Sequence, residues 1–216
     1  MTETQIYSIG HSRHRLDDFL ALLHQNGIEV VVDVRSAPYS RFVPQYNHDQ
    51  LRQALSDAGI RYLYKGRALG GRSEDPGHYV DGRLDYQRLG ASDSFVAGLE
   101  LLCQLARSHR LAIMCSEEDP MACHRGVLIG RKLQDDGQGI RVVHIRGDGS
   151  LETQSEMEHR LCMQQGMVQD PSTKTLYVTA DLWTAAEASL AEAVAQAYAA
   201  QGERIAPTKS SEDEGR

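Results

Sequence analysis

A regular alternation of short apolar runs with amphipathic stretches covers the first 146 residues and constrains the fold more than any other feature of the sequence. Five runs have the length and composition of β-strands: residues 5–10, 28–35, 60–65, 110–115 and 140–145. The second, IEVVVDVR, is almost continuously apolar, as expected of a central parallel strand covered on both faces. The alternation therefore predicts a three-layer α/β/α domain with a mostly parallel sheet of about five strands, joined by right-handed crossovers.

Amphipathic segments with helical periodicity separate these strands, at residues 15–27, 47–59, 92–109 and 120–137. Ser12 and Asn47 are the predicted N-terminal caps of the first two helices. Gly27 and Gly59 are predicted to end them. Residues 66–90 are rich in glycine and charge, so this stretch is predicted to be irregular.

Beyond the predicted domain, which spans residues 1–148, the alternation of strands and helices is lost. Residues 149–202 predict a helical extension that ends in an alanine-rich helix, and residues 203–216 predict a disordered tail. We favour packing of the alanine-rich helix against its own domain over a homodimer contact. Such a contact would use four side chains of that helix, Trp183, Leu190, Val194 and Tyr198.

The composition argues against several classes of protein. The net charge of −7 argues against a protein that coats nucleic acid through bulk positive charge, but it allows a local basic pocket. The start, MTETQIYSIGHS, is unlike a signal peptide, and no apolar stretch approaches the roughly 20 residues that span a bilayer. Four cysteines are too few for a disulfide framework, so we expect free thiols, with Cys103 and Cys162 packed in the core. We therefore expect a cytoplasmic protein with no membrane contact.

Polar and reactive residues follow each predicted strand. His11 and Ser12 follow the first, Arg35 ends the second, and the segment KGRALGGR begins at the end of the third. The segment CSEEDPMACHR begins at the end of the fourth strand, and His144 lies near the end of the fifth. The carboxyl ends of parallel strands meet at one edge of a sheet, where open α/β sheets bind ligands. The sequence therefore predicts a shared site at that edge.

The segment CSEEDPMACHR concentrates reactive side chains between a predicted strand and a predicted helix. Cys115 is predicted at the end of the strand, and Pro120 suits the first turn of the helix. Cys123, His124 and Arg125 then fall in or near that first turn, where backbone N–H groups favour anions and lower the pKa of a thiol. The guanidinium of Arg125 adds a forked donor suited to a phosphate or a carboxylate.

Three interpretations of this segment remain open. In the first, Cys115 or Cys123 is an activated thiolate, and Glu117 is its orienting group or general base. The candidate proton carriers are three histidines, His11, His124 and His144. In the second, a divalent metal binds four residues, Cys115, Glu117, Cys123 and His124, although the sequence requires no cofactor. In the third, Glu117 pairs with Arg125, and both thiols are buried and unreactive.

The segment DVRSAPYSRFVPQYN, which begins at the end of the second strand, offers groups that suit a phosphate and a stacked base. Its candidate anion contacts are Arg35, Ser40 and Arg41. The alternative is a solvated loop in which Asp33 pairs with a neighbouring arginine. In the next glycine-rich segment, Gly70 and Gly71 either let the backbone approach a ligand closely or form a tight turn.

Five separated motifs occur within residues 5–146, in the order YSIGHS, VVDVRSAPYSR, ALGG, MCSEEDPMACHR and VVHI. This series resembles the DUF488 family, a bacterial domain of unknown function. The resemblance implies an α/β domain and supplies no reaction or cofactor. The positions that match the family's pattern are His11, Ser12, Asp33, Arg35, Pro38, Ser40, Arg41, Gly70, Gly71, Cys115, Glu117, Cys123, His124 and Arg125.

These residues together predict a hydrolase or transferase acting on a small anionic substrate, such as a nucleotide or a nucleic-acid-derived molecule. The predicted catalytic residues are His11, Cys115, Glu117, Cys123 and His124. The predicted substrate contacts are Ser12, Asp33, Arg35, Ser40, Arg41, Gly70, Gly71 and Arg125. Two alternatives remain: a non-catalytic sensor or adaptor that binds a nucleotide or nucleic acid, and a metal-binding protein.

Overall fold

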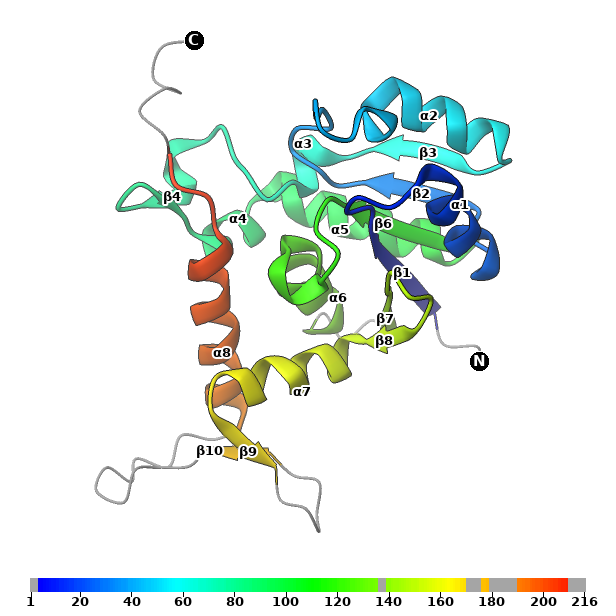
Figure 1. The fold of residues 1–216 in the computed structure, drawn as a ribbon. Coiled ribbons are helices and arrows are strands. Elements are labelled where there is room, and N and C mark those ends of the chain that lie inside the picture. The colour runs from blue at the N-terminus through cyan, green and yellow to red at the C-terminus, as the bar shows by residue number, and fades with distance from the viewer. Residues whose placement is uncertain (1–3, 136–138, 170–175, 179–189, 210–216) are drawn as a thin grey trace, which may run out of the picture.

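The computed structural model describes residues 4–135, 139–169, 176–178 and 190–209. Its central sheet has six strands, β1 (Thr4–Gly10), β2 (Val30–Asp33), β3 (Arg61–Tyr64), β6 (Leu111–Cys115), β7 (Ile140–Ile145) and β8 (Leu151–Thr153). They lie in the order β3-β2-β6-β1-β7-β8, and all neighbours are parallel except β7 and β8. The structure thus confirms a three-layer α/β domain with a mostly parallel sheet (Figure 1).

Helices cover both faces of this sheet (Figure 1). One face carries α1 (Leu16–Gln25) and α2 (His48–Asp57), and the other carries α5 (Asp93–Ala106) and α6 (Arg131–Asp135). On β2, Val31 packs with the helices of the first face, whereas Val30 and Val32 pack with those of the second. Successive side chains of a strand point to opposite faces, so the continuous apolar run fills two hydrophobic cores.

The carboxyl ends of β1, β2 and β6 lie at the same edge of the sheet. Gly10 is paired with Cys115, and Asp33 with Met114. The chains stay together beyond the strands, because the His11 N–H donates a hydrogen bond to the Cys115 carbonyl. The predicted edge therefore brings together segments that follow three different strands.

The ends of the first two helices were predicted better than their caps. Gly27 and Gly59 follow the helices with φ of +61° and +74°, in the left-handed region that favours glycine. The prediction of Ser12 as the first cap is wrong, because α1 begins after Arg15. Asn47 does precede α2, but its side-chain oxygen accepts the N–H of Ser40 instead of capping the helix.

Residues 66–90, predicted to be irregular, form a series of short elements. They are α3 (Gly66–Leu69), η2 (Pro76–His78), β4 (Tyr79–Val80), β5 (Arg83–Leu84) and α4 (Tyr86–Gly90). The side chains of Asp75 and Asp85 accept hydrogen bonds from the first backbone N–H groups of η2 and α4. The prediction is wrong because elements of two to five residues are too short to show a periodic pattern.

The single helix predicted over residues 120–137 is also wrong. The 3₁₀-helix η3 (Pro120–Ala122) ends at Cys123, which is extended, and the π-helix η4 (Arg125–Gly130) then leads into α6. Side-chain capping by Asp119 at the Met121 N–H favours the separate short turn. Single π turns inside helices occur frequently at functional sites.

The C-terminal extension packs directly on the domain (Figure 1). Residues 151–153, predicted within the helical extension, form the sixth strand β8, and α7 (Gln154–Gln164) follows with a capping box made by Thr153 and Glu156. A small antiparallel pair, β9 (Met167–Gln169) and β10 (Leu176–Val178), comes before α8 (Leu190–Ile205). The side chains of α7 and α8 form a third hydrophobic core with those of η3 and η4.

The alanine-rich helix buries its apolar face within its own chain. Val194 and Tyr198 lie in the third core and are covered there, which favours packing on the domain over a homodimer contact through these two side chains. Trp183 and the side chain of Leu190 lie outside the described residues. None of the helices in the described ranges is long and apolar enough to cross a membrane.

The segment predicted as a disordered tail begins inside α8 and continues as ordered chain. The N–H of Leu84 donates to the carbonyl of Pro207, and the N–H of Lys209 donates to the carbonyl of Gly82. Residues 203–209 are therefore part of the fold, because they pair with the β4–β5 hairpin. Residues 210–216 lie outside the described ranges.

Candidate functional site

A cavity of about 420 Å³ opens at the carboxyl edge of β2 and β6, and we call it the rim cavity. Its volume is in the range of small-molecule binding sites. Its lining residues are Arg35, Ser36, Ala37, Tyr39, Gly71, Arg72, Tyr86, Cys115, Ser116, Glu117, Ala122, Cys123, His124, Ile205 and Pro207. The cavity therefore brings together three of the five segments that the sequence placed at this edge.

Two thiols and an imidazole lie close together in the wall of the rim cavity. The Nδ1 atom of His124 is 3.8 Å from the Sγ atom of Cys115 and 3.7 Å from the Sγ atom of Cys123. All three atoms lie within 4.8 Å of one another, and all three residues are buried. We call this group the Cys–Cys–His cluster.

The orientation of His124 is fixed from both sides. Its Nε2 atom lies 3.2 Å from the carbonyl oxygen of Val34, and because a carbonyl only accepts, Nε2 carries the proton. Nδ1 of the neutral ring is then an acceptor that faces both thiols. Gly71 packs against the ring so closely that a Cβ atom there would lie 2.9 Å from the His124 Cγ and Nδ1 atoms.

Adjacent residues of a regular helix or strand point in different directions, yet Cys123 and His124 converge. Cys123 is extended, with φ of −138° and ψ of 143°, whereas His124 is helical, with φ of −57° and ψ of −24°. The change of backbone conformation between them turns both side chains toward Cys115. The irregular start of the helix is therefore what assembles the Cys–Cys–His cluster.

The two thiols have opposite tendencies to ionise. The pKa of Cys115 is raised well above its usual range, first because its S–H donates to Cys123 and second because it is buried. Burial also raises the pKa of Cys123, but the hydrogen bond from Cys115 and the charge of Arg125 outweigh this effect. The pKa of Cys123 is therefore lowered well below its usual range, so Cys123 is the thiol of the pair that ionises more readily.

Arg125 is fully buried and does not line the rim cavity. Its guanidinium donates hydrogen bonds to the backbone carbonyls of Glu117 and Glu118, so it fixes the loop after β6. Its Nε atom is buried without a partner in the described structure. The predicted ion pair between Arg125 and Glu117 does not form, because the carboxylate of Glu117 is exposed while Arg125 lies inside.

Arg35 lines the rim cavity, but its guanidinium is already paired with the carboxylate of Asp33. The guanidinium binds both oxygens of Asp33, with distances of 2.9 and 2.6 Å, and the hydroxyl of Tyr62 donates to the same carboxylate. Arg35 also donates to His11 Nε2 at 3.2 Å. The ion pair predicted as an alternative for this segment therefore forms, and it offsets the charge that was expected to attract an anion.

The two histidines predicted as further proton carriers lie outside the rim cavity. His11 stacks on Tyr46, and burial together with the charge of Arg35 lowers its pKa to about 4. Both of its ring nitrogens are engaged, because Nδ1 donates to the Ser12 carbonyl and Nε2 accepts from Arg35. His11 therefore orients Arg35 as a neutral acceptor.

His144 is buried inside the sheet instead of lying at its edge. Its Nδ1 atom is 2.6 Å from the Ser8 hydroxyl, and its Nε2 atom is 2.9 Å from the side-chain oxygen of Gln154. Gln154 in turn donates to the hydroxyl of Tyr198. The ring therefore belongs to a polar network that ties β1 and β7 to α7 and α8.

Four other predicted contacts do not line the rim cavity. Ser12 has a φ of +44° in the turn after β1. The backbone N–H of Ser40 is held by Asn47, and the guanidinium of Arg41 lies over the ring of the exposed Phe42. Gly70 is the fourth, and a Cβ atom there would lie 2.4 Å from the Ser36 hydroxyl. The glycine pair therefore allows a close approach, but to the protein itself.

The sequence profile of the domain of unknown function DUF488 matches residues 15–131, which is more than half of the chain. The chain belongs to the DUF488 family. The match is narrower than the resemblance over residues 5–146, but it includes the Cys–Cys–His cluster of this DUF488 protein. No curated protein and no solved structure matches the chain.

The rim cavity of this DUF488 protein also contains residues that the sequence did not single out. Arg72 ends the glycine-rich segment, and Tyr86 begins a helix that was not predicted. Ile205 and Pro207 belong to the segment that was predicted as disordered. Ile205 and Pro207 in the segment ERIAPT were the available signal, because a tail that stays solvated contains few apolar residues.

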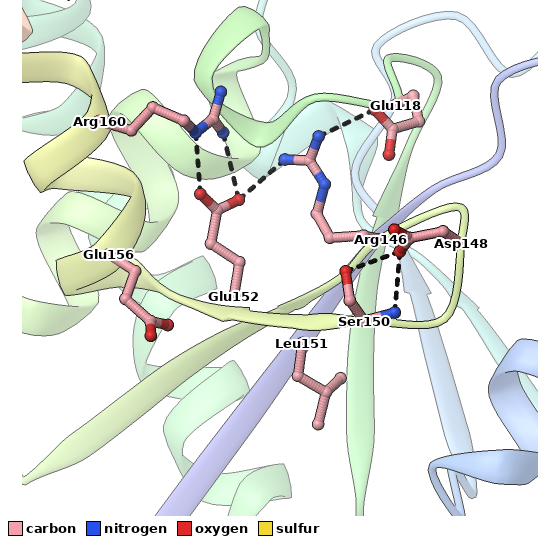
Figure 2. A pocket seen from close by; sticks show the side chains of 8 residues that line it. All are labelled: Glu118, Arg146, Asp148, Ser150, Leu151, Glu152, Glu156 and Arg160. Carbon is pink, nitrogen blue, oxygen red and sulfur yellow. Dashed lines mark hydrogen bonds and ion pairs between the residues drawn. The ribbon is translucent and has the colours of Figure 1, made fainter.

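A second, larger hollow of about 590 Å³ lies on the surface beside the β7–β8 turn (Figure 2). Its arginines, Arg146 and Arg160, are both paired with Glu152, and Arg146 also contacts Glu118. Asp119 joins the same network through both arginines. In this DUF488 protein the hollow is therefore a set of ion pairs that fastens the extension to the loop after β6.

Proposed function

We propose that this protein is a hydrolase or transferase that binds a small anionic substrate, of the nucleotide class, in the rim cavity. The observation that carries the proposal is the Cys–Cys–His cluster in the cavity wall. Two thiols and an imidazole, all buried, face one another there. The Nε2–H of His124 donates to the Val34 carbonyl, which leaves Nδ1 as an acceptor toward the thiols. Such preorganised groups are typical of catalytic sites. Burying them is unfavourable where they serve only to pack the protein.

Two further residues support an anionic substrate with an aromatic ring. Arg72 is exposed at the rim cavity, and within the described structure no carboxylate pairs with its guanidinium. Tyr39 leaves 68% of its surface exposed at the same cavity, so its ring is available for stacking. A guanidinium beside an exposed ring suits the phosphate and the base of a nucleotide.

The matched test compares Arg72→Gln with Arg67→Gln, which removes an exposed arginine that does not line the rim cavity. Calorimetric titration with nucleoside monophosphates and diphosphates should give a Kd about tenfold higher for Arg72→Gln, through loss of a charge-assisted contact. Arg67→Gln should bind like the wild type. Uncharged nucleosides should bind more weakly than nucleotides, and equal binding would overturn the choice of an anionic substrate.

Turnover separates the enzyme from a non-catalytic sensor or adaptor. Chromatography should detect conversion of a bound nucleotide by the wild type and by Cys103→Ala, which changes a buried cysteine of α5 outside the cavity. His124→Asn should abolish conversion. Binding of nucleotides or oligonucleotides without conversion of any would identify a sensor or adaptor instead.

We further propose a cytoplasmic location for this reaction. All four cysteines are buried and none forms a disulfide, and the sulfur atoms of the two in the cluster lie within 4.8 Å of each other. A reducing compartment keeps such a pair as thiols. Fractionation of the source cells with a specific antibody would test the location, and recovery in an extracellular fraction would contradict it.

A further inference from the structure

The Cys–Cys–His cluster has the donor set and the spacing of a metal site. We propose that Cys115, Cys123 and His124 bind a zinc ion whose fourth coordination position opens into the rim cavity. The inference deepens the proposed function. Only one part of it rests on that function, namely that the substrate is the fourth ligand. The metal itself is argued from the cluster alone.

The distances agree with tetrahedral coordination. With zinc–sulfur bonds of about 2.3 Å and zinc–nitrogen bonds of about 2.0–2.1 Å, neighbouring sulfur and nitrogen ligands lie about 3.6 Å apart. The two sulfur–nitrogen distances in the cluster are 3.8 and 3.7 Å. Both sulfur–nitrogen distances therefore lie within a few tenths of an ångström of the tetrahedral value, and all three donor atoms lie within 4.8 Å of one another, as a preformed site requires.

The surroundings of His124 are those of a metal ligand. Histidines that bind zinc almost always donate the other ring N–H to a carbonyl or carboxylate, which fixes the tautomer. The Val34 carbonyl has this role here, and Gly71 supports the ring from the cavity side. Nδ1 is therefore held ready as a lone-pair donor before any metal arrives.

The donor set also limits the kind of site. Thiolate and imidazole ligands suit zinc better than magnesium or calcium, which prefer oxygen. Three protein ligands with an open position are typical of catalytic zinc, whereas structural zinc has four. Glu117 lines the cavity, but it is not part of the cluster within the described structure, so the four-ligand set considered from the sequence becomes a three-ligand set.

A zinc ion supplies the contact for an anion that the predicted arginines do not. Arg35 is offset by Asp33, and Arg125 is buried away from the cavity. Although two thiolates would balance its charge, a zinc ion with three protein ligands remains a Lewis acid with one open coordination position. An anionic substrate oxygen or hydroxide is therefore the favoured fourth ligand.

The direct test measures metal in the full-length protein purified without chelators. Mass spectrometry of the metals should find one equivalent of zinc per chain, and cobalt should replace it with the absorption bands of tetrahedral thiolate coordination. Cys115→Ser, Cys123→Ser and His124→Asn should each lose most of the metal. Cys103→Ala is the matched control, and loss of zinc from it as well would show that the metal is bound elsewhere.

A measurement on the wild type guards against variants that do not fold. Titration with a mercurial reagent should release zinc in step with the reaction of two thiols. Protein that holds no zinc after incubation with the ion, and gives no cobalt bands, would overturn the proposal. So would zinc release that is independent of thiol modification.

Nucleotide titrations of zinc-loaded and zinc-free protein separate the two proposals. Stronger binding to the zinc-loaded protein, by about tenfold or more, is expected if the metal contacts the anion. Equal nucleotide binding and turnover without any metal would overturn the substrate as the fourth zinc ligand and leave the proposed function standing. Zinc binding without nucleotide binding would leave the metal site standing and overturn the proposed function.

Discussion

His144 illustrates how a single buried side chain can make the whole fold sensitive to acid. It is fully buried, and both ring nitrogens are hydrogen-bonded, to Ser8 and to Gln154. Burial, assisted by the charge of Arg125, lowers its pKa to about 3. The ring is therefore neutral in the folded protein at all moderate pH values, whereas the unfolded chain takes up a proton near pH 6.5.

The free energy of unfolding should consequently fall as the pH is lowered from about 6.5 toward 3, because the unfolded state binds the proton first. Above about pH 6.5 the contribution of His144 is constant. His144→Gln keeps polar partners for its neighbours and removes this titration. Its urea-unfolding free energy should fall less steeply with pH than that of the wild type, by up to about 1.4 kcal/mol per pH unit.

The matched control is His24→Gln, which changes an exposed histidine at the end of α1. It should keep the pH dependence of the wild type. An unchanged slope for His144→Gln between pH 6 and pH 4 would show that the ring is already protonated in the folded state.

At the scale of single elements, the approach of Gly71 to His124 should be sensitive to one methyl group. Gly71→Ala would place a Cβ atom 2.9 Å from the ring, so the imidazole or the loop must shift. We expect about a tenfold or greater loss of zinc affinity and of turnover, since second-shell changes have effects of this size. Metal analysis and chromatographic assays of the variant measure both.

Gly77→Ala is the control for that variant. A Cβ atom at Gly77 meets only the exposed carboxylate of Asp75, which can move away. It should retain zinc and activity at the wild-type level. If Gly71→Ala behaves in the same way, the loop does not position His124.

The strands were predictable from the sequence, but the start of the helix that carries the cluster was not. Buried parallel strands leave continuous apolar runs, such as residues 28–35, and such a run predicts a strand with little dependence on the flanking sequence. The break at Cys123 leaves no such pattern, because one extended residue between two helical turns does not alter the periodicity. For this reason the convergence of the adjacent Cys123 and His124 side chains could not be predicted from the sequence.

At the scale of the whole molecule, topology was enough to predict where the rim cavity lies. Parallel strands bring Arg35, Cys115 and the glycine-rich loop to one edge, as their positions after successive strands indicated. The sequence could not tell which arginines are free, because pairing with Asp33 or burial depends on packing. It also could not show that residues 205–207 close the cavity from the far end of the chain.

This closure can be tested by shortening the chain from its C-terminus. A chain ending at residue 209 should match the full protein, because it keeps every described residue of α8 and the contact of Pro207 with Leu84. A chain ending at residue 202 loses Ile205 and Pro207 from the cavity wall. We expect it to bind nucleotides about tenfold more weakly and to be about 1–3 kcal/mol less stable.

Calorimetry and urea unfolding of the two shortened chains provide the measurements. Both chains lack residues 210–216, so any difference between them reports on residues 203–209 alone. Equal nucleotide affinity for both would mean that this segment covers the cavity without contributing to binding.

The late position of Ile205 and Pro207 has a consequence for synthesis on the ribosome. The sheet and the Cys–Cys–His cluster are complete once β8 has emerged, some fifty residues before the segment that finishes the cavity wall. A nascent chain can thus bind the proposed zinc ion before the cavity wall is complete. The wall of the rim cavity is complete only after the last turn of α8 and the residues that follow it have left the exit tunnel.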